Sequence, residues 1–334
     1  MPPHGRPQTV RSESISVTLI IWVAVAFFEA ACWGLVVVVD KRVLDFVTPL
    51  AVNLGVRAVS LVLMLVVVLP LTLLHLWSLT FAMTWDAAGV IAISAFVTWM
   101  LAFNCYYFAL RAGRASVVAP ITSTDPLFAA LFSAILIGSA LGGLTIAGLA
   151  VATAGVVLFA RWLEPASEAH AEIAAPLPGA DYNDPVRAVV LSVLTAAGWG
   201  MGPVLIEVAE RGMGGPSATM MLESQFLGML MLAVVVKLRR VPLLTRKLSP
   251  PELRLALLLL LTAGALETVF SILYYLVIDH IGAVLVVLIV GTSPIFSIVG
   301  GIILLKEKFG AKLALAASIT LGGVFLATLQ RVLT

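Results

Sequence analysis

The chain has 334 residues, of which 61% are hydrophobic and 11% are charged, and its formal net charge is +2. Ordinary soluble domains carry about 25% charged residues, so this composition excludes a soluble fold. The near-neutral charge, without a basic cluster among aromatic residues, argues against nucleic acid as a partner. Apolar runs of about 20 residues, each long enough to cross a hydrocarbon core, recur without strand-like alternation. We therefore expect an all-α integral membrane protein embedded in the lipid bilayer of the cell membrane.

A polar N-terminal tail, residues 1–16, precedes the first apolar run, which is longer than a signal-peptide core and is expected to remain as the first helix. We place ten transmembrane helices at residues 17–39, 48–74, 86–110, 115–137, 144–162, 186–206, 216–236, 253–278, 282–304 and 312–331. Residues 163–185 hold five acidic residues and several prolines, which predicts a solvated linker. The linker separates a first repeat, residues 17–162, from a second repeat, residues 186–331.

The two halves of the chain repeat the same motifs. Pro126-Leu127-Phe128 recurs as Pro294-Ile295-Phe296 after 168 residues (294 − 126), and Trp33-Gly34 recurs as Trp199-Gly200 after 166 residues (199 − 33). Because each half has five spans, an odd number, the second half must enter the membrane from the opposite side. We therefore expect two inverted five-helix repeats related by a pseudo-two-fold axis in the membrane plane, an architecture typical of alternating access.

Glycines and prolines mark particular spans. Small residues let helix backbones approach closely, so we interpret the glycines around the fifth, ninth and tenth spans as packing faces: Gly138, Gly142, Gly143, Gly148, Gly300, Gly301, Gly322 and Gly323. Among the prolines of the spans, we expect four to interrupt the helices and help them bend: Pro120, Pro126, Pro203 and Pro294.

The order of these motifs resembles the EamA-type repeat of the drug/metabolite transporter superfamily. In the first half the resemblance rests on residues 109–120, 126–131 and 148–158. In the second half it rests on residues 281–283, 294–296, 306–308 and 322–323. It covers about residues 20–160 and 186–330, and Trp33-Gly34, Trp199-Gly200 and Arg57 also match it. The resemblance implies a ten-helix carrier that holds a small polar metabolite, such as an amino acid or a related compound, between its halves.

The chain departs from this family pattern at two places. The first half has Ser139 where the repeat usually carries a glutamate like Glu307. The second half has Glu223 or Ser224 at the position that corresponds to Arg57. Both departures bear on the substrate rather than on the fold.

Among the ionisable side chains of the expected spans five stand out, and because each costs about 2.5–3.5 kcal/mol to insert we treat them as functional candidates: Glu29, Arg57, Asp125, Glu223 and Glu267. Arg57 and Glu223 occupy near-equivalent repeat positions, so they either form an ion pair between the halves or contact the substrate. Asp125 either satisfies backbone groups freed by Pro126 or serves transport. Glu29 and Glu267 have no partner in the sequence and are candidates for proton or substrate coupling.

Further candidates are the aromatic and amide side chains Trp33, Trp199, Tyr274 and Asn104. Glu29 and Trp33 are four residues apart and share a helix face, and so do Glu267 and Tyr274, seven apart. A carboxylate beside an aromatic ring could bind a cation or an amine. The alternative for Trp and Tyr is interfacial anchoring, and Asn104 could instead form a hydrogen bond between helices.

Lysine and arginine residues are distributed unevenly between the two sides of the expected helices. The connections between spans 1 and 2, 3 and 4, 5 and 6, 7 and 8, and 9 and 10 carry 15 of the 20 Lys and Arg residues. The side with both termini carries Arg6, Arg11, Arg211 and Arg331. The positive-inside rule therefore places both termini outside, whereas the resemblance implies cytoplasmic termini, and both orientations stay open.

Together these features favour a secondary active transporter, an exporter or exchanger of a small-molecule substrate, with protons as a candidate coupling ion. The sequence has no Gly-x-x-x-x-Gly-Lys-Ser/Thr loop that would bind a nucleotide. Its four histidines and two cysteines show no metal-ligand spacing, so we expect no enzyme, no metal and no cofactor. A membrane-embedded enzyme and a non-transporting channel or scaffold remain the alternatives.

Overall fold

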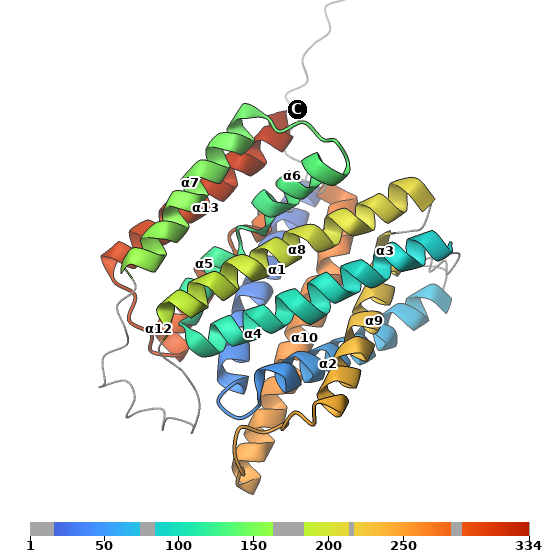
Figure 1. The fold of residues 1–334 in the computed structure, drawn as a ribbon, viewed down its shortest axis with the longest axis vertical. Coiled ribbons are helices and arrows are strands. Elements are labelled where there is room, and N and C mark those ends of the chain that lie inside the picture. The colour runs from blue at the N-terminus through green and yellow to red at the C-terminus, as the bar shows by residue number, and fades with distance from the viewer. Residues whose placement is uncertain (1–16, 74–83, 163–183, 214–216, 282–288, 334) are drawn as a thin grey trace, which may run out of the picture.

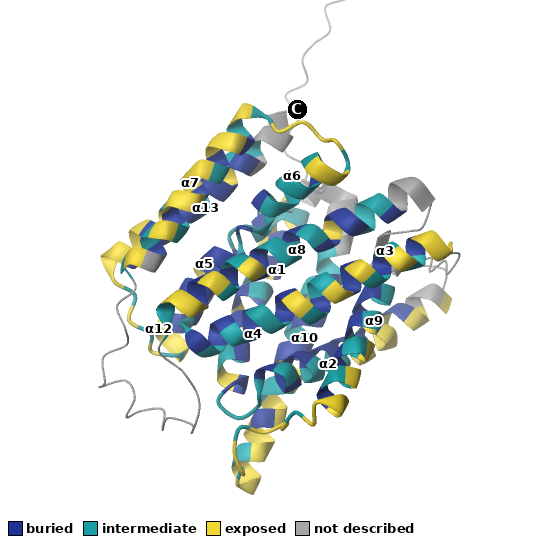
Figure 2. Ribbon diagram, in the orientation of Figure 1, coloured by how far each residue is buried: buried dark blue, intermediate teal, exposed yellow. Residues whose placement is uncertain are grey.

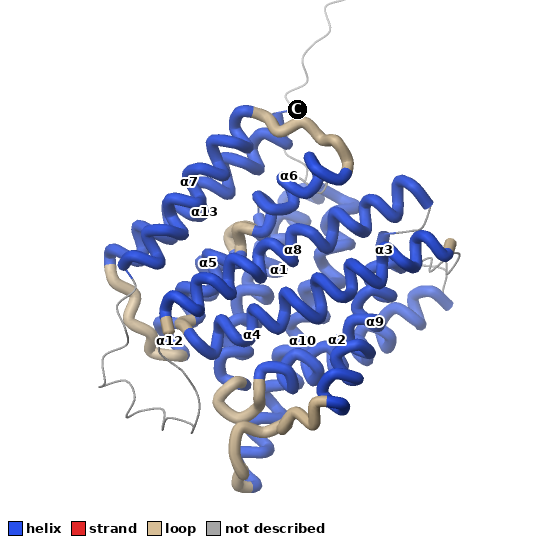
Figure 3. The backbone as a smooth tube through the Cα atoms, in the orientation of Figure 1, coloured by secondary structure: helices blue, strands red, loops and turns tan. Residues whose placement is uncertain are grey.

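The computed structural model describes residues 17–73, 84–162, 184–213, 217–281 and 289–333, and these residues fold into helices joined by short loops (Figure 1). Among the described residues no β-strand is present, and the tube view shows helix and loop only (Figure 3). The expected N-terminal tail and nearly all of the expected linker lie outside the described residues. The structure therefore confirms the prediction of an all-α protein.

The first repeat comprises five helical spans, and the bounds lie within a few residues of those predicted. They are α1 (Val17–Val43), α2 (Pro49–Leu73), a third span made of α3 (Trp85–Ala95), the π-helix η1 (Phe96–Ala102) and α4 (Phe103–Ala112), a fourth made of α5 (Ala115–Thr122) and α6 (Asp125–Leu136), and α7 (Gly143–Trp162). The second repeat comprises α8 (Pro185–Met213), α9 (Ser217–Leu238), α10 (Pro250–Ile281), a ninth span described as α12 (Ser293–Leu304), and α13 (Ala311–Leu333).

The outer surface of the bundle is that of a membrane protein. Six of the described helical stretches are long and apolar enough to cross a membrane, from Ile20–Val43 to Pro250–Tyr274. Large apolar side chains such as Phe28, Val66 and Ile303 are exposed on the outside, and the outward faces of α7 and α13 are exposed along much of their length (Figure 2). This apolar exterior fits a lipid environment, in which the buried interior is reserved for helix contacts and polar groups.

Two of the four prolines that we expected to interrupt helices lie at helix starts. The fourth span breaks at Ser123 and Thr124, and Pro126 lies in the first turn of α6. Pro294 lies in the first turn of α12. A proline is tolerated there because its missing N–H has no helical acceptor to bond. The prediction that all four prolines interrupt helices is wrong for Pro120 and Pro203, which lie inside α5 and α8.

The duplicated Trp-Gly motif of each repeat packs on the duplicated Pro-x-Phe helix of the other repeat. A Cβ atom on Gly34 of α1 would lie 2.6 Å from Cβ of Phe296 in α12. A Cβ atom on Gly200 of α8 would lie 2.8 Å from Cβ of Phe128 in α6. Each glycine therefore permits a close approach that an added methyl group would block, and the two contacts are related by the repeat. The exchange of equivalent contacts fits the expected two-fold relation between the halves.

The last helices of the two repeats, α7 and α13, lie side by side at one edge of the molecule (Figure 1). A Cβ atom on Gly155 would lie 2.5 Å from the Thr320 backbone nitrogen, and one on Gly323 would lie 2.7 Å from Cα of Ala152. These are again equivalent contacts, since 323 − 155 and 320 − 152 both equal 168. The predicted packing role is confirmed for Gly148, Gly300, Gly301 and Gly323 but is wrong for Gly138, Gly143 and Gly322, whose missing side chains would meet open space.

Candidate functional site

Aromatic rings from both repeats meet in the interior of the bundle. The ring centroids of Trp33 and Trp199 are 5.5 Å apart in an edge-on arrangement. Trp33 also stacks on Phe270 at 4.8 Å, and Trp199 lies 4.9 Å from Phe103 and 5.3 Å from Tyr106. The two tryptophans are therefore internal contacts between the repeats, and the alternative of interfacial anchoring is wrong for both.

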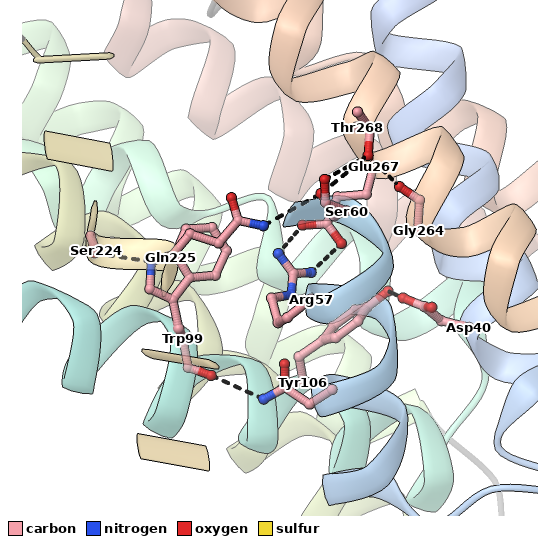
Figure 4. A network of polar contacts seen from close by, with 11 residues as sticks. Asp40, Arg57, Ser60, Trp99, Tyr106, Ser224, Gln225, Gly264, Glu267 and Thr268 are labelled. Carbon is pink, nitrogen blue, oxygen red and sulfur yellow. Dashed lines mark hydrogen bonds and ion pairs between the residues drawn. The ribbon is translucent and has the colours of Figure 1, made fainter. Parts of the chain in front are cut away.

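A buried ion pair lies beside this aromatic cluster. The guanidinium group of Arg57 on α2 donates to both carboxylate oxygens of Glu267 on α10, and the two side chains are only 1% and 2% exposed (Figure 4). The same guanidinium group lies over the rings of Trp99 and Phe103, at 4.8 and 4.1 Å from their centroids. Cation–π attraction thus adds to the charge pairing of Arg57.

The ion pair corrects two sequence predictions. Arg57 pairs with Glu267 rather than with Glu223, and Glu267 therefore has a partner. Glu223 is half-buried on α9, and its neighbour Ser224 accepts a hydrogen bond from Trp99 Nε1 at 3.0 Å. The physical reason is that α2 also packs against α10, from which Glu267 reaches Arg57, whereas its contact with α9 joins Ser60 to Gln225.

A second acidic residue, Asp40, belongs to the same interior region and was missed in the sequence. Asp40 is fully buried and accepts a hydrogen bond from the Tyr106 hydroxyl at 3.1 Å (Figure 4). It lies within electrostatic reach of Arg57. The predicted first span ended at residue 39, so the prediction assigned Asp40 to the polar connection that also holds Lys41 and Arg42. Because α1 continues to Val43, the Asp40 carboxylate instead faces the bundle interior.

Asn104 forms hydrogen bonds between helices, as one of its two interpretations predicted. Its side-chain oxygen accepts from Asn53 Nδ2 at 3.0 Å, and its Nδ2 donates to the Met100 carbonyl oxygen at 2.5 Å. Asn53 also donates to the carbonyl oxygen of Trp99 at 2.9 Å. Trp99 belongs to the π-helix η1, whose wider turn presents this carbonyl to α2, and such segments are frequent at functional sites. The two asparagines therefore fix α2 against the third span and hold Trp99 over Arg57.

Three of the predicted residues gather in a second polar region. Glu29 on α1 is fully buried, and neither of its carboxylate oxygens has a hydrogen-bond partner among the described residues. Tyr274 on α10 lies within electrostatic reach of both Glu29 and Asp125, the first residue of α6. Tyr274 also contacts Phe270, with ring centroids 5.9 Å apart, and so joins this region to the tryptophan pair.

Comparison with known proteins decides the family. A model of the EamA-like transporter family matches residues 20–161 and residues 186–329, which is most of the chain in two copies. The chain belongs to the EamA-like transporter family. This EamA-like protein is therefore a multi-pass membrane transporter of the drug/metabolite transporter superfamily, and the resemblance seen in its sequence is confirmed.

Two further comparisons bear on the EamA-like transporter. It is similar to a solved crystal structure with a TM-score of 0.58 and 16% sequence identity, over 93% of this chain and 98% of that chain. At that identity the likeness supports the fold alone. No curated protein matched the sequence.

Polar contacts join the two repeats at one face of the EamA-like transporter. Glu307 of the second repeat accepts hydrogen bonds from the backbone N–H groups of Ala115 and Ser116, at 2.8 and 2.9 Å, and from the Ser116 hydroxyl. It thereby caps the N-terminus of α5 in the first repeat, where a carboxylate is favourable. Nearby, Arg114 Nη1 donates to the Lys308 carbonyl oxygen at 2.8 Å. The sequence singled out Glu307 as a motif residue, but its capping role was not predicted.

The same face is held within the first repeat by Lys41. Its ammonium group donates to the carbonyl oxygens of Leu110 and Gly113, the latter at 2.6 Å, and so ties the end of α1 to the turn between α4 and α5. Elsewhere on the connections of this side, Thr48 Oγ1 donates to the Pro242 carbonyl oxygen at 2.7 Å, and Val47 pairs with Leu244. These contacts join the 1–2 connection to the 7–8 connection. Both belong to the side on which Lys and Arg are concentrated.

Proposed function

We propose that this transporter is a secondary active exporter or exchanger of a small polar metabolite that works by alternating access between its two repeats. The observation that carries the proposal is the interior layer formed by the Trp33–Trp199 contact and the Arg57–Glu267 ion pair. In this layer both repeats supply aromatic and charged side chains that contact one another. In this layer the proposed substrate contacts are Trp33, Trp199, Arg57, Glu267 and Tyr274. A transporter needs such polar groups in its interior, where they are too costly to keep for packing alone.

The Arg57–Glu267 pair is suited to a switching role. Burying two charges removes their hydration, and the attraction between them does no more than offset that cost, so such pairs add little to stability. The pair connects α2 of one repeat to α10 of the other, and a movement of the repeats would separate it. A substrate with a carboxylate or an ammonium group could then take the place of one partner. Asp40, which lies within electrostatic reach of Arg57, offers the guanidinium a second carboxylate during that exchange.

The polar contacts around Glu307 and Lys41 are the proposed gate of the closed face. Glu307 and the α5 N-terminus come from different repeats, so opening this face requires their hydrogen bonds to break. Alternating access in inverted-repeat transporters proceeds by rocking one repeat against the other around a fixed site. The contacts of the proposed gate lie at the ends of helices, whereas the interior layer with its proposed substrate contacts lies further inside. This separation of gate and site is what alternating access requires.

Protons are the proposed coupling ion, and Glu29 is the proposed group that carries them. It is a carboxyl group in the middle of α1, it is buried, and it forms no ion pair with any described basic side chain. A buried carboxyl group of this kind must be neutral or meet a cation. Proton binding and release at Glu29 would therefore accompany changes in its access to water.

Counterflow into proteoliposomes tests the transport function. Vesicles that contain the purified protein are loaded with an unlabelled compound and exposed to the same labelled compound, across a panel of zwitterionic, cationic and anionic amino acid derivatives. We expect transient, saturable accumulation of at least one compound, and its loss in Glu267→Gln. Asp86→Asn, a change of the same kind at an exposed position on α3, is the control and should retain counterflow. Flux that stays linear with concentration would indicate a channel, and turnover without sealed vesicles would indicate an enzyme.

A further inference from the structure

The connection between α9 and α10 carries a dense set of exposed basic side chains. Residues 237–254 hold six basic residues and one acidic residue, and all six basic residues are exposed: Lys237, Arg239, Arg240, Arg246, Lys247 and Arg254. The acidic residue, Glu252, pairs with Arg246 at 2.6 Å. The other five basic side chains have no acidic partner among the described residues. The protein therefore leaves most of the charge on this segment uncompensated.

Exposed leucines alternate with these charges at the boundary of the bilayer. Leu238, Leu243, Leu253 and Leu255 are all exposed, and Figure 2 shows exposed residues along the connection and the start of α10. The 32 residues of α10 make it about 48 Å long, more than the ~30 Å of a hydrocarbon core. Its N-terminal end accordingly extends past the neighbouring helices (Figure 1). Such a segment can bury its leucines among acyl chains while its basic groups stay at the level of the headgroups.

The backbone of the connection is fastened to the first repeat. The Thr48 N–H group donates to the Leu243 carbonyl oxygen at 3.1 Å, and the Thr245 N–H group donates to the Phe46 carbonyl oxygen at 3.0 Å. These reciprocal bonds hold the segment in one place between α9 and α10. A ligand that binds its side chains therefore does not have to order the backbone as well, which lowers the entropic cost of binding.

Arg240 occupies a position where glycine is the usual residue. The helix α9 ends in a Schellman motif, in which the Val241 N–H group donates to the Val236 carbonyl oxygen at 3.0 Å and the Arg240 N–H group donates to the Lys237 carbonyl oxygen at 3.2 Å. Arg240 has a φ of 48°, a conformation that glycine adopts without steric cost. Its exposed side chain forms no ion pair with a described residue. The folding of the chain thus gives no reason for an arginine here, whereas a ligand outside the chain would.

The orientation of the helices does not account for this concentration of charge. The side of the protein that is rich in Lys and Arg has five connections, yet one of them carries 6 of its 15 basic residues. The equivalent connection of the first repeat, residues 74–84, contains neither lysine nor arginine. A basic side needs only a modest excess of charge over all its connections. The excess at residues 237–254 is therefore a property of this segment.

We infer that residues 237–254 form a surface that binds the headgroups of anionic phospholipids. The arginine and lysine side chains donate to phosphate oxygens, and a headgroup with a net negative charge binds better than a zwitterionic one, whose own ammonium group offsets its phosphate. A soluble phosphate compound would satisfy the same donors but would leave the leucines in water. The occupant is therefore a lipid. The surface anchors the joined 1–2 and 7–8 connections to the membrane, and this role does not depend on the transported substrate.

Native mass spectrometry of the full-length protein in a neutral detergent tests the surface. We expect adducts with dioleoylphosphatidylglycerol at a concentration roughly tenfold lower than with dioleoylphosphatidylcholine. The test variant replaces three basic residues of the surface: Arg239→Gln, Arg240→Gln and Lys247→Gln. It should weaken binding of the anionic lipid about 100-fold, which is roughly fivefold for each charge removed. The control variant removes three exposed charges from other connections of the same side and should bind as the wild type does: Arg161→Gln, Lys306→Gln and Lys312→Gln. Equal weakening in both variants would show that only the total charge matters and would overturn the inference.

A second measurement uses the wild-type protein in lipid nanodiscs, so that it holds even where the test variant fails to fold. Hydrogen–deuterium exchange at the amides of residues 239–249 should be slower in phosphatidylglycerol than in phosphatidylcholine, and high salt should reduce the difference by screening. The region around Gly155 on α7 is the internal reference. Glycerol 3-phosphate added to phosphatidylcholine discs should have no effect. Equal exchange in the two lipids, or protection by glycerol 3-phosphate equal to that by the anionic lipid, would contradict a lipid-binding surface.

Discussion

Two contacts between the repeats occupy equivalent positions and use different chemistry. Arg57 on α2 pairs with Glu267 on α10, while Ser224 on α9 accepts a hydrogen bond from Trp99 in the third span at 3.0 Å. The positions correspond, since 224 − 57 equals 167 and 267 − 99 equals 168. One contact is therefore a buried ion pair and its counterpart is a neutral hydrogen bond. The comparison teaches that duplication fixed where the repeats touch, while later substitution decided which contact carries charge.

A second pair of equivalent positions differs in the same way. Glu307 caps the N-terminus of α5 across the repeat boundary, whereas Ser139, its counterpart in the first repeat, is exposed in the turn after α6. In each comparison the charged contact therefore joins the two repeats. The Arg57–Glu267 pair joins them in the interior, and Glu307 joins them at the face on which Lys and Arg are concentrated. By contrast, the crossing of α7 and α13 keeps matched contacts in both repeats. The helix packing is symmetric, and the charges are not.

The largest effect is expected for Glu267→Gln, which breaks the charged member of the first comparison. The change leaves the Arg57 guanidinium buried without its carboxylate, and such a loss typically costs about 3–5 kcal/mol. Thermal unfolding of the purified protein measures the loss. The double variant Arg57→Gln with Glu267→Gln should recover part of it, because no unpaired charge remains. A midpoint for Glu267→Gln equal to that of the wild type would show that the ion pair does not hold the repeats together.

The next largest effect is expected at the symmetric helix crossing. Gly323→Ala places a methyl group against the backbone of Ala152 on α7 and should destabilise the protein by about 1–3 kcal/mol through overpacking. Gly322→Ala is the matched control, since its methyl group would meet open space, and it should be neutral or slightly stabilising. Unfolding midpoints of the two variants provide the measurement. Equal destabilisation by both would argue against close packing at this crossing.

Glu307→Gln should have a smaller effect that is confined to the closed face. Removing the charge weakens the cap on α5 by about 0.5–2 kcal/mol. Hydrogen–deuterium exchange should then become faster at the amides of Ala115 and Ser116, which donate to Glu307. Exchange in the Gly155 region of α7 serves as the internal reference and should not change. Unaltered exchange at Ala115 and Ser116 would mean that other contacts keep this face closed.

The smallest effect is expected for Ser224→Ala, which removes the neutral counterpart of the ion pair. Loss of one ordinary hydrogen bond from Trp99 should cost about 1 kcal/mol. Trp99→Phe keeps a ring beneath Arg57 while removing the same donor, and it should behave alike. Comparison of both variants with Glu267→Gln, by the same unfolding measurement, ranks the two contacts. A cost for Ser224→Ala as large as that for Glu267→Gln would remove the proposed difference between them.

The sequence was sufficient for the helices and for the inverted repeats. Span length and hydropathy set the helices, because a segment must satisfy its own backbone within the bilayer. The repeat spacing of 166–168 residues correctly marked Trp33 and Trp199 as a related pair, and their rings touch in the structure. It also marked Pro126 and Pro294, which begin α6 and α12. These features follow from local chemistry or from symmetry, and both can be read along the chain.

The partners of the charged residues could not be read in this way. Repeat spacing pointed from Arg57 to Glu223, whereas the true partner, Glu267, is 210 residues away on a helix that only the packing of α2 against α10 brings near. Asp40 was missed because one extra turn of α1 decides whether it faces the loop or the interior. Pairing depends on helix rotation and crossing, which composition and spacing leave undetermined. The roles of all nine candidate residues in transport remain predictions.

The exchanged glycine contacts have a consequence for how this molecule arose. Gly34 meets Phe296 and Gly200 meets Phe128, so residue i of one half touches residue j of the other and the reverse also holds. That reciprocity defines an isologous dimer interface, here contained in one polypeptide. In a homodimer, every substitution would appear in both copies of a contact. Only a fused chain can place an arginine–glutamate pair beside a tryptophan–serine pair at equivalent positions, as the contact of Arg57 with the Trp99 ring shows.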